Sequence, residues 1–190
     1  MRKAQVKRQT DETDIEVKLN LDGSGKYNVS TGTKFFDHML ENFTKHACFD
    51  LEIKATGDNE HHIVEDVGIA LGQALTEAIG DKRGITRFGQ AVIPMDDVLV
   101  LTSVDLGGRT YTNIEAKFRK KKIEDLSSEM IEHFLQSLAS ETRMNMHIKF
   151  LDGRNEHHKA EAIFKSLALA LKNAVTLDER KGLPSTKGML

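Results

Sequence analysis

The sequence predicts an α+β fold built from two tandem β-β-β-α-β-α repeats related by a pseudo-twofold axis. Three observations lead to this prediction. Short segments of the first half recur in the same order in the second, each half passes through the same succession of strand and helix patterns, and no proline-rich or low-complexity linker separates the halves. We therefore expect a single domain over residues 1–190 with a shared core: one repeat at about 1–84, a second at about 85–180 and a tail at 181–190.

The duplication rests on three pairs of similar segments. They are residues 37–40 with 132–135, 50–54 with 145–149, and 59–65 with 155–161. Order and spacing agree to within a slip of one residue. Such a constant period indicates that one supersecondary unit occurs twice.

Each element of the first repeat follows from its residues. Alternating apolar and polar side chains predict strands at 4–8 and 14–21, and the turn residues 22–25 lead into a third strand at 26–30, so we expect three antiparallel strands. Capping and turn residues then predict the remaining elements. These are a helix that starts after Thr33 and runs to about Lys45, a strand at 49–55 and a helix at 60–79 that ends at Gly80.

The second repeat shows the same succession. Its strand patterns lie at 90–94, 97–105 and 110–118, and a helix follows with Ser127 or Ser128 as its N-cap. A strand at 144–151 and a helix at 156–171 complete the repeat. Both halves therefore read as β-β-β-α-β-α.

Composition limits the class of protein. The chain has 27 Lys and Arg against 29 Asp and Glu, with 39% hydrophobic and 29% charged residues, which supports a folded core and excludes disorder or a coiled coil. The net charge of -2 argues against nucleic acid as a partner. No run approaches the roughly 20 apolar residues of a membrane span, and the first thirty residues lack the apolar core of a signal peptide. The single Cys48 suits a reducing compartment. We expect a cytoplasmic protein without a membrane partner.

Two adjacent histidine pairs carry the main chemical signal. Each pair follows Asn-Glu and precedes a glutamate in the same register. On a helix, His61 and Glu65 lie on one face at i and i+4, close enough to chelate one ion, whereas His62 points about 100° away. The second repeat arranges its residues in the same way: His157, Glu161 and His158.

A third histidine in each repeat completes the pattern. His38 and His133 each follow the proposed N-cap of their helix by five positions. Symmetry then permits two metal sites, with His61, Glu65, His133 and His158 at one and His157, Glu161, His38 and His62 at the other. It equally allows each adjacent histidine to join the nearer site. Imidazole with carboxylate suits Mn, Fe, Co, Ni or Zn, and four protein ligands leave positions open for a substrate.

Residues present in only one repeat are candidates for binding an anion. Lys165 lies seven positions after His158 on the same helix face, where the first repeat has Ile69. A lysine beside a metal site favours an anionic ligand in the same space. Four other residues also suit a phosphate pocket. Arg87 and Arg109 lie close to glycines in the sequence, and Ser185 and Lys187 lie in the tail. We interpret the basic run 119–122 as solvated surface.

These residues resemble those of the imidazoleglycerol-phosphate dehydratase family of histidine biosynthesis along nearly the whole chain. The matching motifs lie at 36–40, 57–66, 84–89, 153–161 and 184–188. The resemblance implies a fold like the second domain of ribosomal protein S5, and a hydro-lyase with two Mn²⁺ per active site. It also implies conversion of D-erythro-imidazole-glycerol phosphate to imidazole-acetol phosphate and water, through a metal-bound imidazolate that helps to expel the C3 hydroxyl.

The resemblance also implies roles for individual residues. His61, Glu65, His157 and Glu161 would serve catalysis as metal ligands, and Glu12 would accept the C2 proton. Substrate would contact Glu12, Asn42, Arg87, Arg109, Lys165, Ser185 and Lys187. Asn42 stands where the family usually has Gln. The family forms a hollow homo-oligomer of about 24 subunits whose metal sites are assembled from neighbouring chains.

Three other functions compete with this interpretation. A metal storage or sensor protein would use the same ligands without turnover. It would have no use for Lys165, Ser185 and Lys187, which we expect to converge on the metals. A nucleic-acid module is suggested by the repeats, which resemble ribosomal protein S5 domain 2, and the net charge of -2 argues against it. A di-metal phosphatase would release inorganic phosphate, which a dehydratase does not.

Overall fold

The computed structural model describes residues 1–178, 180 and 182–189, so two positions of the expected tail, 181 and 190, lie outside the described residues. The first repeat contains β1 (Lys3–Gln9), β2 (Thr13–Asn20), β3 (Tyr27–Ser30), α1 (Lys34–Ala47), β4 (Asp50–Gly57) and α2 (Glu60–Ile79). The second contains β5 (Phe88–Met95), β6 (Val98–Asp105), β7 (Tyr111–Glu115), β8 (Lys122–Ile123), β9 (Leu126–Ser127), α3 (Glu129–Thr142), β10 (Asn145–Asp152) and α4 (Glu156–Val175). The predicted α+β fold of two repeats is confirmed.

The strand order corrects one expectation. The two large sheets have the orders β1-β2-β4-β3 and β5-β6-β10-β7, so the third strand of each repeat lies at an edge and not beside the second. Val29 of β3 pairs with Ile53 of β4 in parallel, and the expected set of three antiparallel strands is therefore wrong. A parallel neighbour requires a crossover connection, which α1 provides between β3 and β4. Alternation of side chains shows that a segment is a strand but not which strand it neighbours.

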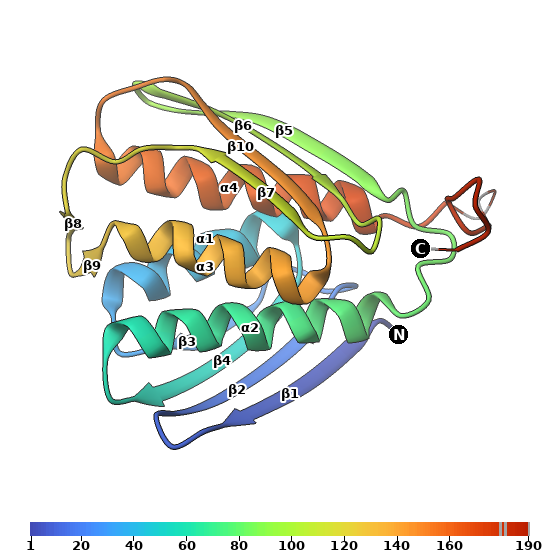
Figure 1. Cartoon of the computed structure of the whole chain (residues 1–190), viewed down its shortest axis with the longest axis horizontal. Helices are drawn as coiled ribbons and strands as arrows, with labels where there is room; N and C mark the ends of the chain where they lie inside the picture. Colours follow the sequence, from blue (N-terminus) through green and yellow to red (C-terminus); the bar gives the residue numbers. More distant parts are fainter. Residues whose placement is uncertain (179, 181, 190) are drawn as a thin grey trace.

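The helices lie between the two sheets (Figure 1). Helix α2 packs on β1 and β2 and against α3, and α4 packs on β5 and β6 and against α1, so every helix pair joins the two repeats. A Cβ at Gly72 would lie 2.6 Å from Cβ of Glu141, which means that glycine permits the close approach of α2 to α3. Phe36, Phe134 and Phe164 form a continuous aromatic contact through the shared core. No described helix is long and apolar enough to span a bilayer.

The starts of the helices place the histidines. Asn59 and Asn155 are the N-caps of α2 and α4, and their side chains accept backbone N–H groups of the adjacent histidine pairs. Thr33 and Ser128 occupy the N-cap positions of α1 and α3, as predicted, but neither side chain makes a capping hydrogen bond. The Ser128 hydroxyl instead donates to the carbonyl of Lys120.

Candidate metal centre

Two clusters of metal-binding side chains lie at the N-terminal ends of α2 and α4. Cluster one comprises His61, Glu65 and His133, and cluster two comprises His38, His157 and Glu161. Within each cluster, one potential ligand atom from every residue lies within 4.8 Å of the others. Each cluster combines residues of both repeats, because the third histidine is carried by α3 or α1, which packs against the helix of the other two ligands.

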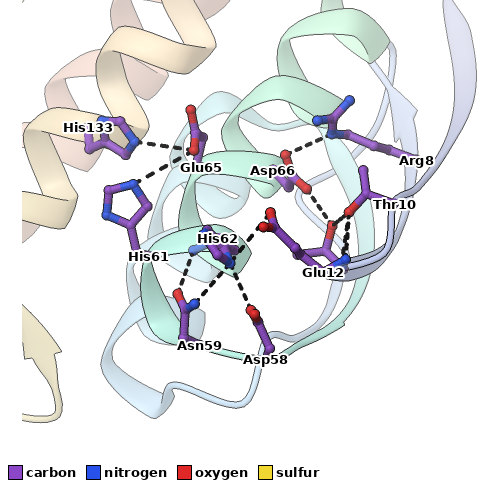
Figure 2. Close-up of polar contacts among 11 residues, drawn as sticks. Arg8, Thr10, Glu12, Asp58, Asn59, His61, His62, Glu65, Asp66 and His133 are labelled. Atoms are coloured by element: carbon purple, nitrogen blue, oxygen red, sulfur yellow. Dashed lines mark hydrogen bonds and ion pairs between the residues drawn. The ribbon is translucent and has the colours of Figure 1, made fainter.

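Cluster one is open, and no lysine or arginine among the described residues forms an ion pair with its glutamate (Figure 2). Glu65 Oε2 lies 3.8 Å from His61 Nε2 and 3.6 Å from His133 Nε2, and 37% of the Glu65 side chain is exposed. Across the residues that the structure describes, His133 Nε2 is the one buried side-chain nitrogen or oxygen without a hydrogen-bond partner. A buried ring nitrogen without a partner is costly, and a metal ion held with His61 and Glu65 would satisfy it.

Cluster two is more enclosed and contains a lysine. Glu161 Oε2 lies 3.5 Å from His157 Nε2 and 4.0 Å from His38 Nε2, whereas Oε1 pairs with Lys165 Nζ at 2.7 Å. Burial raises the pKa of Glu161, but the hydrogen bond and charge of Lys165, together with His38 and His157, outweigh it and hold that pKa below its usual value. The carboxylate is therefore kept in the ionised form that a metal ligand requires.

The donor sets fit a divalent transition metal. Each cluster offers two imidazole nitrogens and one carboxylate, without a thiolate. This combination suits Mn and its neighbours in the first transition row, and three ligands leave coordination positions open. The orphaned Nε2 of His133 is an independent sign that an ion belongs in cluster one.

His62 and His158 lie outside both clusters within one chain. His62 Nδ1 is 2.8 Å from Asp58 Oδ1, and His158 Nδ1 is 2.8 Å from Asp97 Oδ1. The hydrogen bond to Asp58 raises the pKa of His62, and the hydrogen bond from His158 lowers the pKa of Asp97. A carboxylate beside Nδ1 favours the tautomer in which Nε2 can bind a metal, and His158 Nε2 lies 3.4 Å from Asp96 Oδ2.

Sequence reasoning missed Asp58 and Asp97. Asp58 lies four residues before His62, and that spacing could have indicated the contact. Asp97 directly precedes β6, as Glu12 directly precedes β2, so the two acids are equivalent in the duplication. Asp97 holds His158, whereas Glu12 Oε2 is 3.6 Å from His62 Nδ1 and 57% of its side chain is exposed.

A basic pocket lies at the other end of the molecule. A cavity of about 580 Å³ is lined by Arg87, Gly107, Gly108, Arg109, Arg143, Ser185, Thr186, Lys187 and Met189. Four of the five predicted phosphate-binding residues lie in it. The guanidinium of Arg87 is fixed by Asp105, at 2.7 and 3.0 Å, and by the carbonyl of Pro184. Arg143 was missed because it reaches the pocket from the left-handed C-cap of α3.

The pocket and the clusters are separated within one chain. The backbone N–H of Arg87 donates to Ala174 in the last turn of α4, whereas His157 lies in its first turn. Ala174 follows His157 by 17 positions, which corresponds to about 26 Å at the rise of an α-helix. The expectation that Ser185 and Lys187 converge on the metal ligands is therefore wrong for a single subunit.

Lys165 and Asn42 both lie at cluster two. Lys165 pairs with Glu161 and is remote from the basic pocket, because it is on the first half of α4. The amide of Asn42 is 3.1 Å from Nε2 of His38 and also donates to the His38 carbonyl. Both side chains therefore border the ligand set of cluster two.

The chain is similar to known proteins in sequence and in fold. Residues 31–171 match the family model described as imidazoleglycerol-phosphate dehydratase. A protein of that name from Chloroherpeton thalassium is 49% identical over 192 residues, covering 100% of this chain and 98% of the relative. The crystal structure of the Staphylococcus aureus imidazoleglycerol-phosphate dehydratase superposes with a TM-score of 0.86 and 36% identity, covering 93% of this chain and 99% of that one. The structure of IGPD from Pyrococcus furiosus in complex with (S)-C348 superposes with a TM-score of 0.86 and 42% identity, covering 97% of this chain and 100% of that one.

Proposed function

Because the chain belongs to the imidazoleglycerol-phosphate dehydratase family, we propose that it is the hydro-lyase of histidine biosynthesis that converts D-erythro-imidazole-glycerol phosphate to imidazole-acetol phosphate and water. The observation that carries this proposal is the pair of matching His-His-Glu clusters in one duplicated chain. Two equivalent sites suit the two nitrogens of a substrate imidazole ring. The proposal includes one catalytic domain over residues 1–190, with the tail at 181–190 binding substrate.

The proposed cofactor is two Mn²⁺ per active site. Cluster one would be completed by His158 of the partner subunit, and cluster two by His62 of the partner subunit, since these histidines lie outside the clusters of their own chain. When bound, the ions stabilise the anion of the ring and so lower the free energy needed to remove its N–H proton.

An assembly of subunits follows from the distance between pocket and clusters. The substrate spans about 10 Å from ring to phosphate, given six or so bonds of about 1.5 Å. The basic pocket and cluster two of one chain are about 26 Å apart along α4. We therefore infer that the phosphate and the ring are held by different subunits of a homo-oligomer, for which the family's assembly of about 24 chains is the proposed form.

The chain's own residues divide the remaining work. Arg87, Arg109, Lys165, Ser185 and Lys187 would neutralise the phosphate, and Asn42 would contact the substrate near His38. Glu12 would accept the C2 proton. Its exposed carboxylate lies 3.6 Å from His62 Nδ1, whereas the shortest hydrogen bond of that ring is with Asp58, at 2.8 Å. The hydroxide lost from C3 and the proton that Glu12 takes from C2 together make up the water released, and the resulting enol would tautomerise to the ketone.

The setting of the enzyme belongs to the same proposal. The partner is a small phosphorylated imidazole, with neither nucleic acid nor membrane, and the location is cytoplasmic. The near balance of acidic and basic side chains supports the exclusion of nucleic acid.

One assay separates this function from its competitors. The metal is removed from the purified protein, and keto product and inorganic phosphate are followed from imidazole-glycerol phosphate with and without added Mn²⁺. Metal-dependent keto product without phosphate release is expected. Phosphate release would indicate a phosphatase, and tight Mn²⁺ binding without turnover in the assembled oligomer would indicate a storage protein.

A further inference from the structure

The second repeat contains a hairpin that the first repeat lacks. Three residues, 31–33, connect β3 to α1, whereas thirteen residues, 116–128, connect β7 to α3. The extra residues form the short antiparallel pair of β8 and β9, residues 122–127, which we term the β8–β9 hairpin. It lies at the end of the molecule where α2 and α4 begin (Figure 1).

The tip of this hairpin caps a helix of the other repeat. Asp125 Oδ2 accepts the backbone N–H of Lys34 at 2.9 Å, and Oδ1 accepts that of Phe35, also at 2.9 Å. The residue at the N-cap position, Thr33, makes no capping hydrogen bond with its side chain. Asp125 thus performs from 90 residues away the function that an N-cap side chain usually performs locally, and its negative charge also suits the helix N-terminus.

Glu124, the residue before Asp125, contacts His157 of cluster two. Glu124 Oε1 lies 3.5 Å from Nδ1 of His157, and Glu124 has a positive φ of 50°, where a side chain is disfavoured. The ring of Phe35, whose N–H Asp125 binds, lies 5.0 Å from the His157 ring. Two adjacent residues of one turn therefore reach both histidine-bearing helices of cluster two.

The base of the hairpin is fixed to the other cluster. Glu60, the residue before His61, accepts the backbone N–H of Ser127 at 3.2 Å. Ser127 ends β9 just before α3, the helix that carries His133. The hairpin thus contacts helices that carry ligands of both clusters. Its base contacts α2 of cluster one, and its tip contacts α1 and α4 of cluster two.

We propose that Asp125 is a positioning residue that holds the start of α1, and with it His38, in register with His157 and Glu161. The proposal rests on the proposed function, because it assigns a role toward the ion of cluster two. His38 is in the second turn of α1, so a shift of the first turn moves its Nε2. This nitrogen lies 4.0 Å from Glu161 Oε2, already farther than His157 Nε2 at 3.5 Å.

The test compares three variants of the full chain. Asp125→Ala removes both acceptors, Asp125→Asn keeps one carbonyl oxygen, and Thr33→Ala is the matched control, because it truncates the N-cap side chain that makes no capping bond. Metal-free protein is titrated with Mn²⁺, and free Mn²⁺ is counted by its paramagnetic resonance signal. Asp125→Ala should weaken one of the two classes of bound ion by about tenfold, Asp125→Asn by less, and Thr33→Ala should not differ from wild type.

Two further measurements assign the effect. In a Glu65→Ala background, where cluster one has lost its carboxylate, the remaining ion should still show the weakening. The visible spectrum of bound Co²⁺, which reports coordination geometry, should change in Asp125→Ala and not in Thr33→Ala. Circular dichroism checks folding, and if Asp125→Ala does not fold, the comparison of Asp125→Asn with wild type decides.

The outcomes are distinct. Wild-type Mn²⁺ affinity and an unchanged Co²⁺ spectrum in folded Asp125 variants would overturn the proposal while leaving the proposed function intact. Equal weakening of both ions would also overturn it, because the effect would then be general. A wild-type protein that binds no Mn²⁺ would overturn the proposed function itself.

Discussion

Clusters one and two have the same ligands on equivalent helices, and they differ in what surrounds the carboxylate. Lys165 pairs with Glu161, of which 10% is exposed, whereas the first repeat has Ile69 at the equivalent position and leaves Glu65 37% exposed. Duplication therefore accounts for two places to hold a metal. The departure from symmetry places a lysine beside the carboxylate of cluster two, where the first repeat has an isoleucine.

Removing either carboxylate should produce the largest effect. Glu65→Ala and Glu161→Ala should each abolish turnover, a loss greater than the roughly 10⁴-fold that follows removal of an acid–base group, because each removes a ligand from one site. Product formation and the number of bound Mn²⁺ are measured together. Substantial turnover in either variant would show that its cluster is not required.

The same two variants, Glu65→Ala and Glu161→Ala, should also differ in their stability to urea. Glu161→Ala leaves the largely buried Lys165 without its carboxylate, so it should unfold at lower urea concentration than Glu65→Ala. The double variant Glu161→Ala/Lys165→Ala should recover part of that difference. Equal urea midpoints for the two single variants would contradict an asymmetry in stability.

The next difference between the repeats concerns Glu12 and Asp97, which occupy equivalent positions before β2 and β6. Glu12→Gln should lower kcat by about 10² to 10⁴ with little change in Mn²⁺ affinity, as expected for loss of a proton acceptor. Asp97→Asn should instead weaken Mn²⁺ binding by about 10- to 100-fold, because Asp97 orients His158. Steady-state kinetics and Mn²⁺ titration of both variants are the measurement. The same response from both would show that the two acids have not diverged.

The ligand clusters could be predicted from the sequence, because their spacing on helices and their repetition constrain them strongly. The i, i+4 pair of His61 and Glu65 needs only helical geometry, and the duplication supplied His133. Asp97 and Asp125 could not be found in this way, since they act across 61 and 91 residues through loops whose course depends on the packing of both repeats.

The strand order and the position of the basic pocket could not be predicted from the sequence. Alternating side chains do not reveal that β4 lies between β2 and β3. Nor does a motif reveal that Arg87 lies beside the last turn of α4 while His157 lies in the first. Distances across the molecule depend on how the elements pack, which local patterns do not encode.

Lys165 offers a more moderate test of the asymmetry. Lys165→Ile makes the second repeat resemble the first, with an isoleucine in place of the cation. We expect kcat/KM to fall by about tenfold to a hundredfold through a higher KM, the effect of losing one charged hydrogen bond to the phosphate. Mn²⁺ affinity should fall only slightly at pH 7, because His38 and His157 still favour the ionised form of Glu161 and face its Oε2, whereas Lys165 occupies Oε1. An unchanged KM would place the phosphate away from cluster two.

The smallest effect concerns the ion pairs of two arginines that occupy equivalent positions in the two repeats. Arg2 and Arg87 each directly precede the first strand of their repeat, and they pair with Asp22 and Asp105. Arg87 also contacts the tail carbonyl of Pro184 in the basic pocket, whereas Arg2 contacts the carbonyl of Val175. One pair therefore belongs to the proposed substrate site and the other only joins the two repeats.

Asp22→Asn should therefore alter stability alone. The Arg2 guanidinium, by its hydrogen bond, holds the pKa of Asp22 below the usual 3.8, so the pair stabilises the fold above that pH and loses this contribution as the pH falls through the lowered pKa. The pair is partly exposed, so the free energy of unfolding at pH 7 should fall by less than about 1 kcal/mol, and the difference from wild type should vanish in acid. Urea unfolding at several pH values measures this change. Asp105→Asn, which frees Arg87, should in contrast raise KM at pH 7, and a normal KM in that variant would mean that the two pairs have the same structural role.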